Sequence, residues 1–340
     1  MAQPAAVGDR IARLIGAEPG HVVMGDTLSI KVYQALAAAL TMRPERKVIL
    51  SDSGNFPTDL YMAEGLIGGL DKGHELRVVA PDEVEQAITD EVAVLMLTQV
   101  DYRTGRMHDM ARLTKKAHEN GALAIWDLAH SAGAVPVDLA ACGADFAVGC
   151  TYKFLNGGPG APAFIYVAPR HADMARPALS GWLGHAAPFA FEQAYRAGDG
   201  IARMRVGTPP VLALASLETA LDVWDGVDMA ALRARSQALS ERFIAAVEAT
   251  CPVLDLASPR DPDRRGSQVS FRFAHGYEAM QACIAHGVIG DFRAPDIMRF
   301  GITPLYIDEA DIDRAAAVIA RIMEQRLWDD AAYRARAAVT

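Results

Sequence analysis

The sequence predicts an α/β fold in which a mostly parallel central sheet is followed by a smaller α+β domain at the carboxyl end. Three observations support this prediction. Short apolar runs alternate with segments of helical period over the first half of the 340-residue chain. Two long helical segments begin after the GTPP sequence at 207–210. A second, shorter series of predicted strands and helices then completes the chain.

The first predicted domain covers residues 1–225 and is expected to be the large cofactor-binding domain. Its seven short apolar runs are typical of strands, and segments of helical period lie between several of them. Strands are expected at 21–24, 47–50, 76–79, 92–97, 122–126, 146–149 and 163–167, and helices at 29–40, 60–66 and 110–120. This alternation favours a mostly parallel sheet with helices on both faces.

The second predicted domain covers residues 226–340. A helix at 211–224 precedes it, and a longer helix is expected at 229–247. A strand at 269–273, a helix at 278–286, strands within 288–300 and a helix at 309–326 follow. This mixture of elements predicts a compact α+β unit.

Composition excludes several kinds of partner. The net charge is −9, and no stretch gathers basic residues with aromatic ones, so we expect no nucleic acid partner. No apolar run approaches the ~20 residues that cross a bilayer. The first residues, MAQPAAVGDR, lack the basic and apolar regions of a secretion signal, which predicts no membrane contact and a cytoplasmic location. The four cysteines (Cys142, Cys150, Cys251 and Cys283) stand far apart, which predicts buried thiols and no metal site.

Lysine is rare in this chain, so each lysine is informative. Only six of the 33 basic residues are lysines, and Lys153 is the last of them. It follows a predicted strand and stands between the sequences CTY and FLNGG. Glycines let the backbone come close to a ligand, and a lysine amine can form a Schiff base with an aldehyde cofactor.

Asp127 provides the second group that such a cofactor requires. Pyridoxal 5'-phosphate (PLP) needs a carboxylate that keeps its pyridine nitrogen protonated, so that the ring can accept electrons. Asp127 ends an apolar strand, and the carboxyl ends of parallel strands are where open α/β sheets bind ligands. A lone lysine would be interpreted as a surface residue. With Asp127 upstream and glycines downstream, the pattern favours a PLP site at Lys153.

Several longer motifs resemble those of one family. They are WDLAHSAGAVPVDL at 126–139, TYKFLNGGPGAPAFIYV at 151–167, GWLGH at 181–185, GTPP at 207–210 and FRAPDIMRFGITPLY at 292–306. Together they span much of the chain and resemble the kynureninases, which are fold-type-I PLP-dependent enzymes related to class V aminotransferases. Cysteine desulfurases share the lysine and Asp-x-x-His elements but not GWxGH with the RFGxTPLY tail.

The resemblance implies a role for each matching residue. It implies that Thr27, Leu28 and Ser29 bind the cofactor phosphate at a helix amino terminus, which has free N–H groups; an ordinary helix cap is the alternative. Trp182 and Thr208 match positions that reach the phosphate from a neighbouring subunit, which implies a homodimer with composite active sites. Arg299 matches the arginine that binds the substrate α-carboxylate. The other implied cofactor-binding residues are Phe56, Asp59, Thr98, Asp127, His130, Tyr152 and Lys153, of which Asp127, Tyr152 and Lys153 are also implied to be catalytic.

The implied reaction is the hydrolysis of a carbon–carbon bond. L-Kynurenine or 3-hydroxy-L-kynurenine would give L-alanine and an anthranilate, a step of tryptophan catabolism. In this mechanism Lys153 takes the α-proton and Tyr152 is the acid–base partner. The sequence leaves open which of the two substrates is preferred.

Two alternatives remain at this stage. One is another class V aminotransferase or a desulfurase, although a desulfurase needs a mobile, reactive cysteine. The other is a catalytically silent relative that binds only a cofactor or a partner chain. Family members usually have an additional amino-terminal segment that helps to enclose the substrate. The resemblance therefore predicts that these 340 residues alone bind PLP and dimerise but hydrolyse kynurenine weakly.

Overall fold

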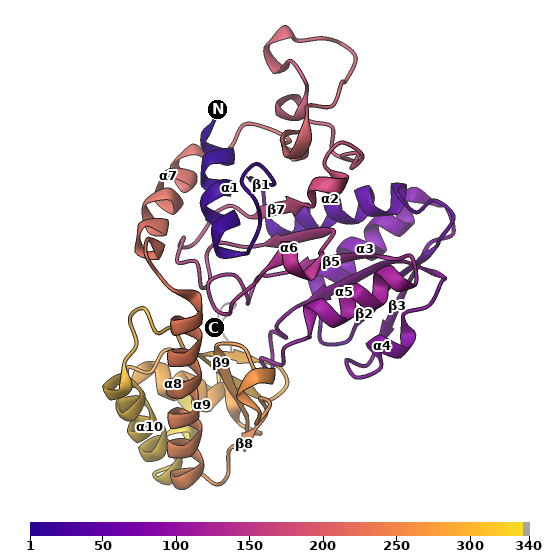
Figure 1. The fold of residues 1–340 in the computed structure, drawn as a ribbon. Coiled ribbons are helices and arrows are strands. Elements are labelled where there is room, and N and C mark those ends of the chain that lie inside the picture. The colour runs from indigo at the N-terminus through magenta and orange to yellow at the C-terminus, as the bar shows by residue number, and fades with distance from the viewer. Residues whose placement is uncertain (336–340) are drawn as a thin grey trace. The chain divides into compact units, whose positions relative to one another are not determined.

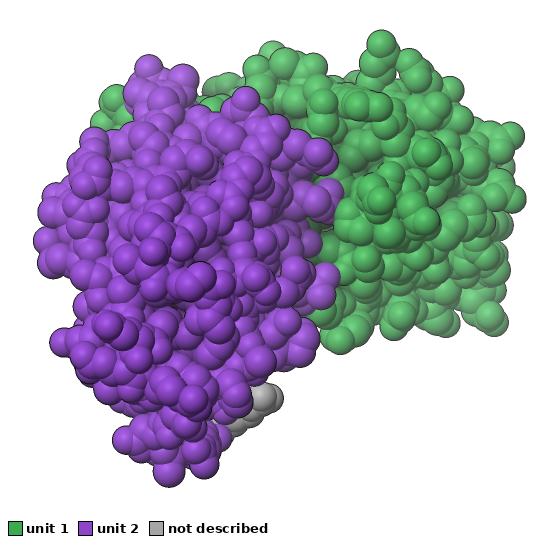
Figure 2. Space-filling view, turned by 90° about the horizontal axis from the view of Figure 1, so that it is seen from below, with its two compact units in different colours: residues 1–99, 108–227 green, residues 100–107, 228–340 purple. Residues whose placement is uncertain are grey.

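The computed structural model describes residues 1–335, which divide into two compact units (Figure 2). Unit 1 comprises residues 1–99 and 108–227, and unit 2 comprises residues 100–107 together with the chain from residue 228 onward. The sequence-based boundary at 225/226 lies close to this division. Sequence analysis did not expect residues 100–107 to separate from the domain that surrounds them. None of the helices within residues 1–335 is long and apolar enough to span a lipid bilayer.

Unit 1 contains a seven-stranded sheet (Figure 1). The strands are β1 (Val22–Met24), β2 (Val48–Asp52), β3 (Glu75–Val79), β4 (Val92–Thr98), β5 (Leu123–Asp127), β6 (Phe146–Gly149) and β7 (Phe164–Val167). Their spatial order is β1-β7-β6-β5-β4-β2-β3. Strands β2 to β6 pair in parallel, whereas β7 is antiparallel to both β6 and β1. The predicted fold class, with a mostly parallel central sheet, is therefore confirmed.

Helices pack on both faces of this sheet and bury all of its strands except the edge strand β3. The helices are α1 (Gln3–Leu14), α2 (Leu28–Thr41), α3 (Pro57–Leu70), α4 (Val84–Ala87), α5 (Met110–Glu119), α6 (Leu139–Cys142) and α7 (Val211–Ala220). In β5, Leu123 and Ile125 belong to the core that includes α2. The alternate residue Trp126 donates a hydrogen bond of 2.9 Å to Thr114 of α5. Sequence analysis did not predict α1.

Unit 2 is built on a four-stranded antiparallel sheet with the order β10-β11-β9-β8. Its elements are α8 (Met229–Thr250), β8 (Asp255–Leu256), β9 (Gln268–Arg272), α9 (Gly276–Ala285), β10 (Asp291–Arg293), β11 (Ile297–Gly301) and α10 (Glu309–Glu324). The rings of Phe243, Phe271 and Phe300 meet in its core. This arrangement matches the α+β unit that the sequence predicted.

Residues 100–107 join unit 2 through their backbone. Gly266 N donates to Gly105 O at 2.8 Å, and Met107 N donates to Arg264 O at 2.8 Å. Gly105 has a positive φ of 73°, and a Cβ at this position would lie 2.8 Å from Gln268 Cγ. A glycine is therefore required where this segment passes β9.

Candidate active site

The site begins at the carboxyl ends of two neighbouring parallel strands. Thr98 ends β4 and Asp127 ends β5, and the two residues are partners in the register. Both are buried. Asp127 Oδ1 accepts a 2.8 Å hydrogen bond from Ala129 N, and Thr98 Oγ1 donates to the Asp127 carboxyl at 3.5 Å. The strand ends thus fix one carboxylate at the sheet edge where α/β proteins bind ligands.

A second buried carboxyl faces the first. Asp59 lies in the first turn of α3 and is 1% exposed. Burial, and then the charge of Asp127, raise the pKa of Asp59 well above its usual range. Asp59 Oδ2 is buried and receives no hydrogen bond from the described residues. Two ionised carboxylates can only accept hydrogen bonds and repel each other. A proton on Asp59 removes this repulsion and can be shared with Asp127 in a hydrogen bond.

Asp127 is also held in a low-dielectric environment. Burial raises its pKa, while the charge of Lys153 and the hydrogen bond from Ala129 act in the opposite direction. No cationic side chain of the described residues hydrogen-bonds to Asp127, so its carboxylate can pair with a protonated ring nitrogen. The pair of acids therefore fits the pyridinium of PLP.

Lys153 lies near this pair and between two aromatic rings. Its Nζ is 6.0 Å from the centre of the Phe56 ring and 5.6 Å from the centre of the Tyr152 ring. Phe56 is 40% exposed and Tyr152 is 48% exposed, so both side chains are accessible from solvent. The structure thus brings together Phe56 and Asp59 from the start of α3, Asp127 from the end of β5 and Lys153 from the loop after β6.

The loop that carries Lys153 is tightly packed on its carboxyl side. Gly157 N donates a 2.8 Å hydrogen bond to Thr151 O, and Thr151 Oγ1 donates to Pro162 O at 2.7 Å. A Cβ at Gly157 would lie 2.9 Å from Ala161 Cβ and 2.9 Å from Thr151 O. The glycine expected downstream of the lysine is therefore needed for close packing of the loop.

The amino terminus of α2 is suited to an anion. Thr27 is its N-cap residue in extended conformation, and its side chain makes no capping hydrogen bond. Thr27 is exposed, and Leu28 and Ser29 are half-buried. The first N–H groups of a helix have no partner within the helix, so they are available to a phosphate.

Three residues that shape the site, Asp52, Asn55 and His108, were not predicted from the sequence. His108 Nε2 lies 2.6 Å from Asp52 Oδ2, and both residues are buried. Asp52 Oδ1 accepts from Gly54 N at 2.9 Å, and Asn55 Oδ1 accepts from Phe56 N at 2.7 Å. These bonds fix the turn that carries Phe56. The polar SDSGN sequence directly after a strand was the available signal.

The remaining predicted residues of unit 1 differ in their environment. His130 is buried three residues after Asp127. Trp182 begins the 3-10 helix Trp182–Gly184, and its ring contacts Phe189 at 5.7 Å. Trp182 is 39% exposed and Thr208 is exposed. Within the described chain the structure brings neither of them into a hydrogen bond or ring contact with Lys153.

Arg299 lies in β11 of unit 2 and is firmly held. Its Nε donates to Asp291 Oδ1 at 2.7 Å, its Nη2 to Asp291 Oδ2 at 2.5 Å, and its Nη1 to Tyr102 O. These three bonds leave two of the five guanidinium N–H groups for another acceptor. A charged residue within an apolar strand requires a partner of opposite charge, and for Arg299 this partner is Asp291.

The cysteines lack the properties of a persulfide-forming group. Cys150, Cys251 and Cys283 are buried, and Cys142 is half-buried. Burial raises the pKa of Cys150 to about 11 and that of Cys283 to about 12. Since the thiolate is the nucleophile, these thiols are poorly reactive, which disfavours the desulfurase alternative.

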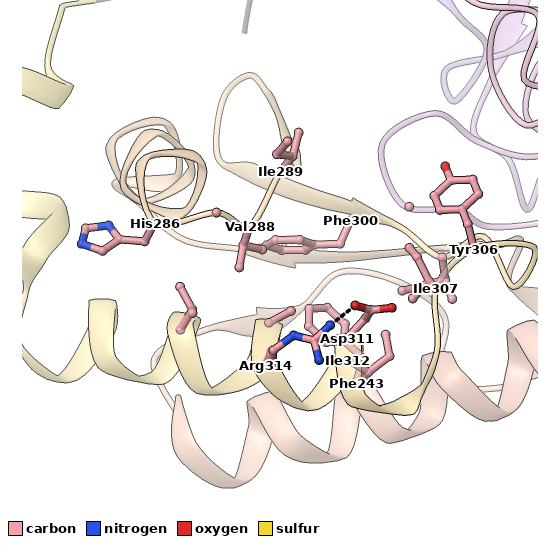
Figure 3. A pocket seen from close by; sticks show the side chains of 15 residues that line it. Phe243, His286, Val288, Ile289, Phe300, Tyr306, Ile307, Asp311, Ile312 and Arg314 are labelled. Carbon is pink, nitrogen blue, oxygen red and sulfur yellow. Dashed lines mark hydrogen bonds and ion pairs between the residues drawn. The ribbon is translucent and has the colours of Figure 1, made fainter.

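A pocket of about 500 Å³ in unit 2 does not belong to this site (Figure 3). It is lined mainly by apolar side chains, including Phe300, Ile307 and Ile312, with the Asp311–Arg314 ion pair among them. None of the predicted site residues lines it.

A lysine at the carboxyl end of a mostly parallel sheet, opposite a buried carboxylate, defines the class of fold-type-I PLP-dependent enzymes. Solved structures of this class share the fold. A cysteine desulfurase from Thermococcus onnurineus NA1 superimposes with a TM-score of 0.80, covering 95% of this chain and 84% of its own, at 17% identity. A mutant of C-DES with glycine covalently linked to its PLP cofactor gives a TM-score of 0.81 at 16% identity, covering 94% and 85% of the two chains.

Closer relatives define the family. Residues 232–319 match the family model described as the kynureninase C-terminal domain. The chain is 51% identical to the kynureninase of Pseudomonas fluorescens over 98% of its own length and 82% of that protein's. It is 50% identical to the kynureninase of Burkholderia pseudomallei (strain 1106a) over 100% and 83% of the two lengths. The chain belongs to the kynureninase family, as its motifs predicted.

Proposed function

We propose that this chain uses PLP to hydrolyse L-kynurenine or 3-hydroxy-L-kynurenine to L-alanine and an anthranilate. The observation that supports it most directly is the arrangement of Lys153, Phe56 and the Asp59–Asp127 pair at one sheet edge. Membership of the kynureninase family supports the choice of reaction. When bound, PLP supplies an electron sink for the carbanions that this reaction requires.

Each part of the site has a separate task in holding the cofactor. Asp127, supported by Asp59 and Thr98, would accept a hydrogen bond from the pyridinium N–H and so keep the ring nitrogen protonated. Phe56 and His130 would contact the ring, and the first turn of α2 at Thr27, Leu28 and Ser29 would bind the phosphate. Because the carboxyl pair is buried, its interaction with a cation is weakly screened by water.

Lys153 and Tyr152 are the proposed proton-transfer groups. The Lys153 amine, which would hold the cofactor, would also take the α-proton of the bound amino acid. Tyr152 stands beside it in the chain, and the centre of its half-exposed ring lies 5.6 Å from Lys153 Nζ. A positioned acid–base group of this kind contributes about 10²–10⁴-fold to the rate.

Arg299 is proposed to bind the substrate α-carboxylate. The bidentate ion pair with Asp291 orients its planar guanidinium, and the remaining N–H groups are available to the carboxylate. Arg299→Ala should therefore raise KM more than it lowers kcat. An unchanged KM would remove Arg299 from substrate binding.

The active unit is proposed to be a homodimer with composite sites. The segment after the 3-10 helix Trp182–Gly184 exposes Phe189 by 64% and Phe191 by 73%, beside the half-exposed Trp182. Exposed aromatic groups of this kind are typical of interfaces. Mixing inactive Lys153→Ala chains with inactive Thr208→Ala chains should restore activity through hybrid dimers. Hybrids that form and remain inactive would place the whole site within one chain.

The decisive experiment measures release of anthranilate from kynurenine by the purified protein with added PLP. Lys153→Ala should abolish it, whereas the matched control Lys115→Ala, at a 79% exposed side chain, should retain it. Borohydride fixation followed by peptide mapping should label Lys153. A label on Lys115 or Lys116, or PLP binding without any hydrolysis, would contradict the proposal. The cytoplasmic location stays a prediction that cell fractionation can check.

A further inference from the structure

Lys31 is a completely buried lysine that the proposed chemistry does not use. It lies in the first turns of α2 and is 0% exposed. Its Nζ donates to Asp26 Oδ2 at 2.9 Å, to Gln34 Oε1 at 3.0 Å and to Met204 O at 3.2 Å. An ammonium group has three donors, and here each has an acceptor. Burying such a charge is costly unless it is paired, so the site is built around it.

The hydrogen bond from Lys31 to Asp26 fixes the turn before α2. Asp26 has a positive φ of 55°, a conformation that non-glycine residues rarely adopt. Gly25 N donates to Ala163 O at 2.9 Å, and Ala163 N donates to Asp26 O at 3.1 Å. The ion pair with Lys31 holds the side chain of Asp26 next to the N-cap residue Thr27. Burial lowers the pKa of Lys31, and Asp26 opposes this effect.

The hydrogen bond from Lys31 to Met204 reaches a segment that is remote in the sequence. Met204 ends the 3-10 helix Gly200–Met204, and its carbonyl accepts from both Lys31 Nζ and Gln34 Nε2, each at 3.2 Å. The chain then continues to Thr208, the residue proposed to reach the phosphate in the partner subunit. One ammonium group therefore connects the two segments to which phosphate binding is assigned.

We propose that Lys31 is a positioning residue for the PLP phosphate. By holding Asp26, Gln34 and the Met204 carbonyl, it fixes the first turn of α2 and the start of the segment that leads to Thr208. It does not contact the phosphate itself. This inference rests on the proposed function, because it assumes that the first turn of α2 binds PLP.

The test removes the three hydrogen bonds while keeping the length of the side chain. Lys31→Met should weaken the PLP Kd of the apoprotein by about 10-fold, which corresponds to about 1.4 kcal/mol of binding free energy. The ³¹P resonance of bound PLP should also shift or broaden. Lys72→Met, at an exposed lysine, is the matched control and should change neither quantity.

Asp26→Asn is the second variant, because asparagine tolerates a positive φ and removes only the charge of the partner. Asp26→Asn should also weaken PLP binding, and it replaces Lys31→Met as the test variant if Lys31→Met does not fold. A Kd and ³¹P spectrum equal to those of the wild type in the folded variants would overturn the proposal. So would a lower Tm of the apoprotein with unchanged PLP binding, because the role would then be purely structural. Failure of the wild type to bind PLP would instead refute the proposed function.

Discussion

The two ends of the central sheet bury carboxylates in opposite ways. At the carboxyl end, Asp59 and Asp127 face one another, and burial raises the pKa of both. At the amino end, Asp145 directly precedes β6 and is 1% exposed. Burial acts to raise the pKa of Asp145 as well, but hydrogen bonds with His118 and His171 bring the pKa well below its usual range.

The difference lies in the partners and not in the depth of burial. Asp145 is 2.7 Å from His118 Nε2, 2.7 Å from His171 Nε2 and 2.6 Å from Arg170 Nη2, and it accepts from Ala124 N at 2.7 Å. Its charge is therefore satisfied within the described chain. Within residues 1–335 the Asp59–Asp127 pair has no imidazole or guanidinium donor of this kind, which is typical of a site that binds a cationic ligand.

The largest expected effect is a loss of activity on substitution at the carboxyl end of the sheet but not at the amino end. Asp127→Asn should lower kcat by about 10²–10³-fold, because an electrostatic group at the reacting centre is lost. PLP retention should change little, since the phosphate provides most of the anchoring. Steady-state assays and a PLP titration measure both quantities. Asp145→Asn serves as the control at the other end, and an equal loss of kcat per folded molecule in both variants would refute the functional distinction.

The free energy of unfolding should fall more for Asp145→Asn than for Asp127→Asn, the reverse of the order expected for kcat. Asp145→Asn leaves Arg170 and the two imidazoles without their carboxylate, and removing one partner of a buried pair costs about 3–5 kcal/mol. The free energy of unfolding in urea should fall accordingly in the apoprotein. Asp127→Asn should not lower it to the same extent. A smaller loss for Asp145→Asn than for Asp127→Asn would contradict this interpretation.

The pH dependence sharpens the contrast at the amino end. The folded-state pKa of Asp145 lies below the unfolded value of about 3.9. Its contribution to stability is therefore present above that value and is lost as the pH falls through the folded pKa. The stability difference between the wild type and Asp145→Asn should shrink below about pH 4. A difference that is constant from neutral to acidic pH would show that the charge of Asp145 is not what stabilises the fold.

The smallest effect is expected for the pH dependence of stability at Asp59, and its sign is opposite to that expected at Asp145. Its folded-state pKa is raised, so its contribution is present below the unfolded pKa and is lost as the pH rises toward the folded pKa. Apoprotein carrying Asp59→Asn should therefore gain stability relative to the wild type between acidic and neutral pH. Thermal unfolding of both proteins across this range measures the trend. A relative loss on raising the pH would show that Asp59 is ionised in the fold.

The sequence predicted elements whose signals are local. All seven strands of unit 1 lie within a few residues of the apolar runs that predicted them, because strands that are buried on both faces, as all but β3 are, consist mainly of apolar residues. Lys153 and Asp127 could be singled out because each follows a strand, and parallel strands end at one edge. Helix α1 was missed because its apolar residues follow no cap or strand signal that stands out in the first residues.

Other features depend on which segments the fold brings together. By itself the sequence determined the class of fold, the lysine and the family motifs, since these depend on residue type and spacing along the chain. Only the tertiary structure decided that Asp59 faces Asp127, that His108 pairs with Asp52 and that Lys31 is buried against Met204. The physical reason is that pKa values and buried ion pairs depend on desolvation and on atoms within a few ångströms, and these neighbours come from remote parts of the sequence.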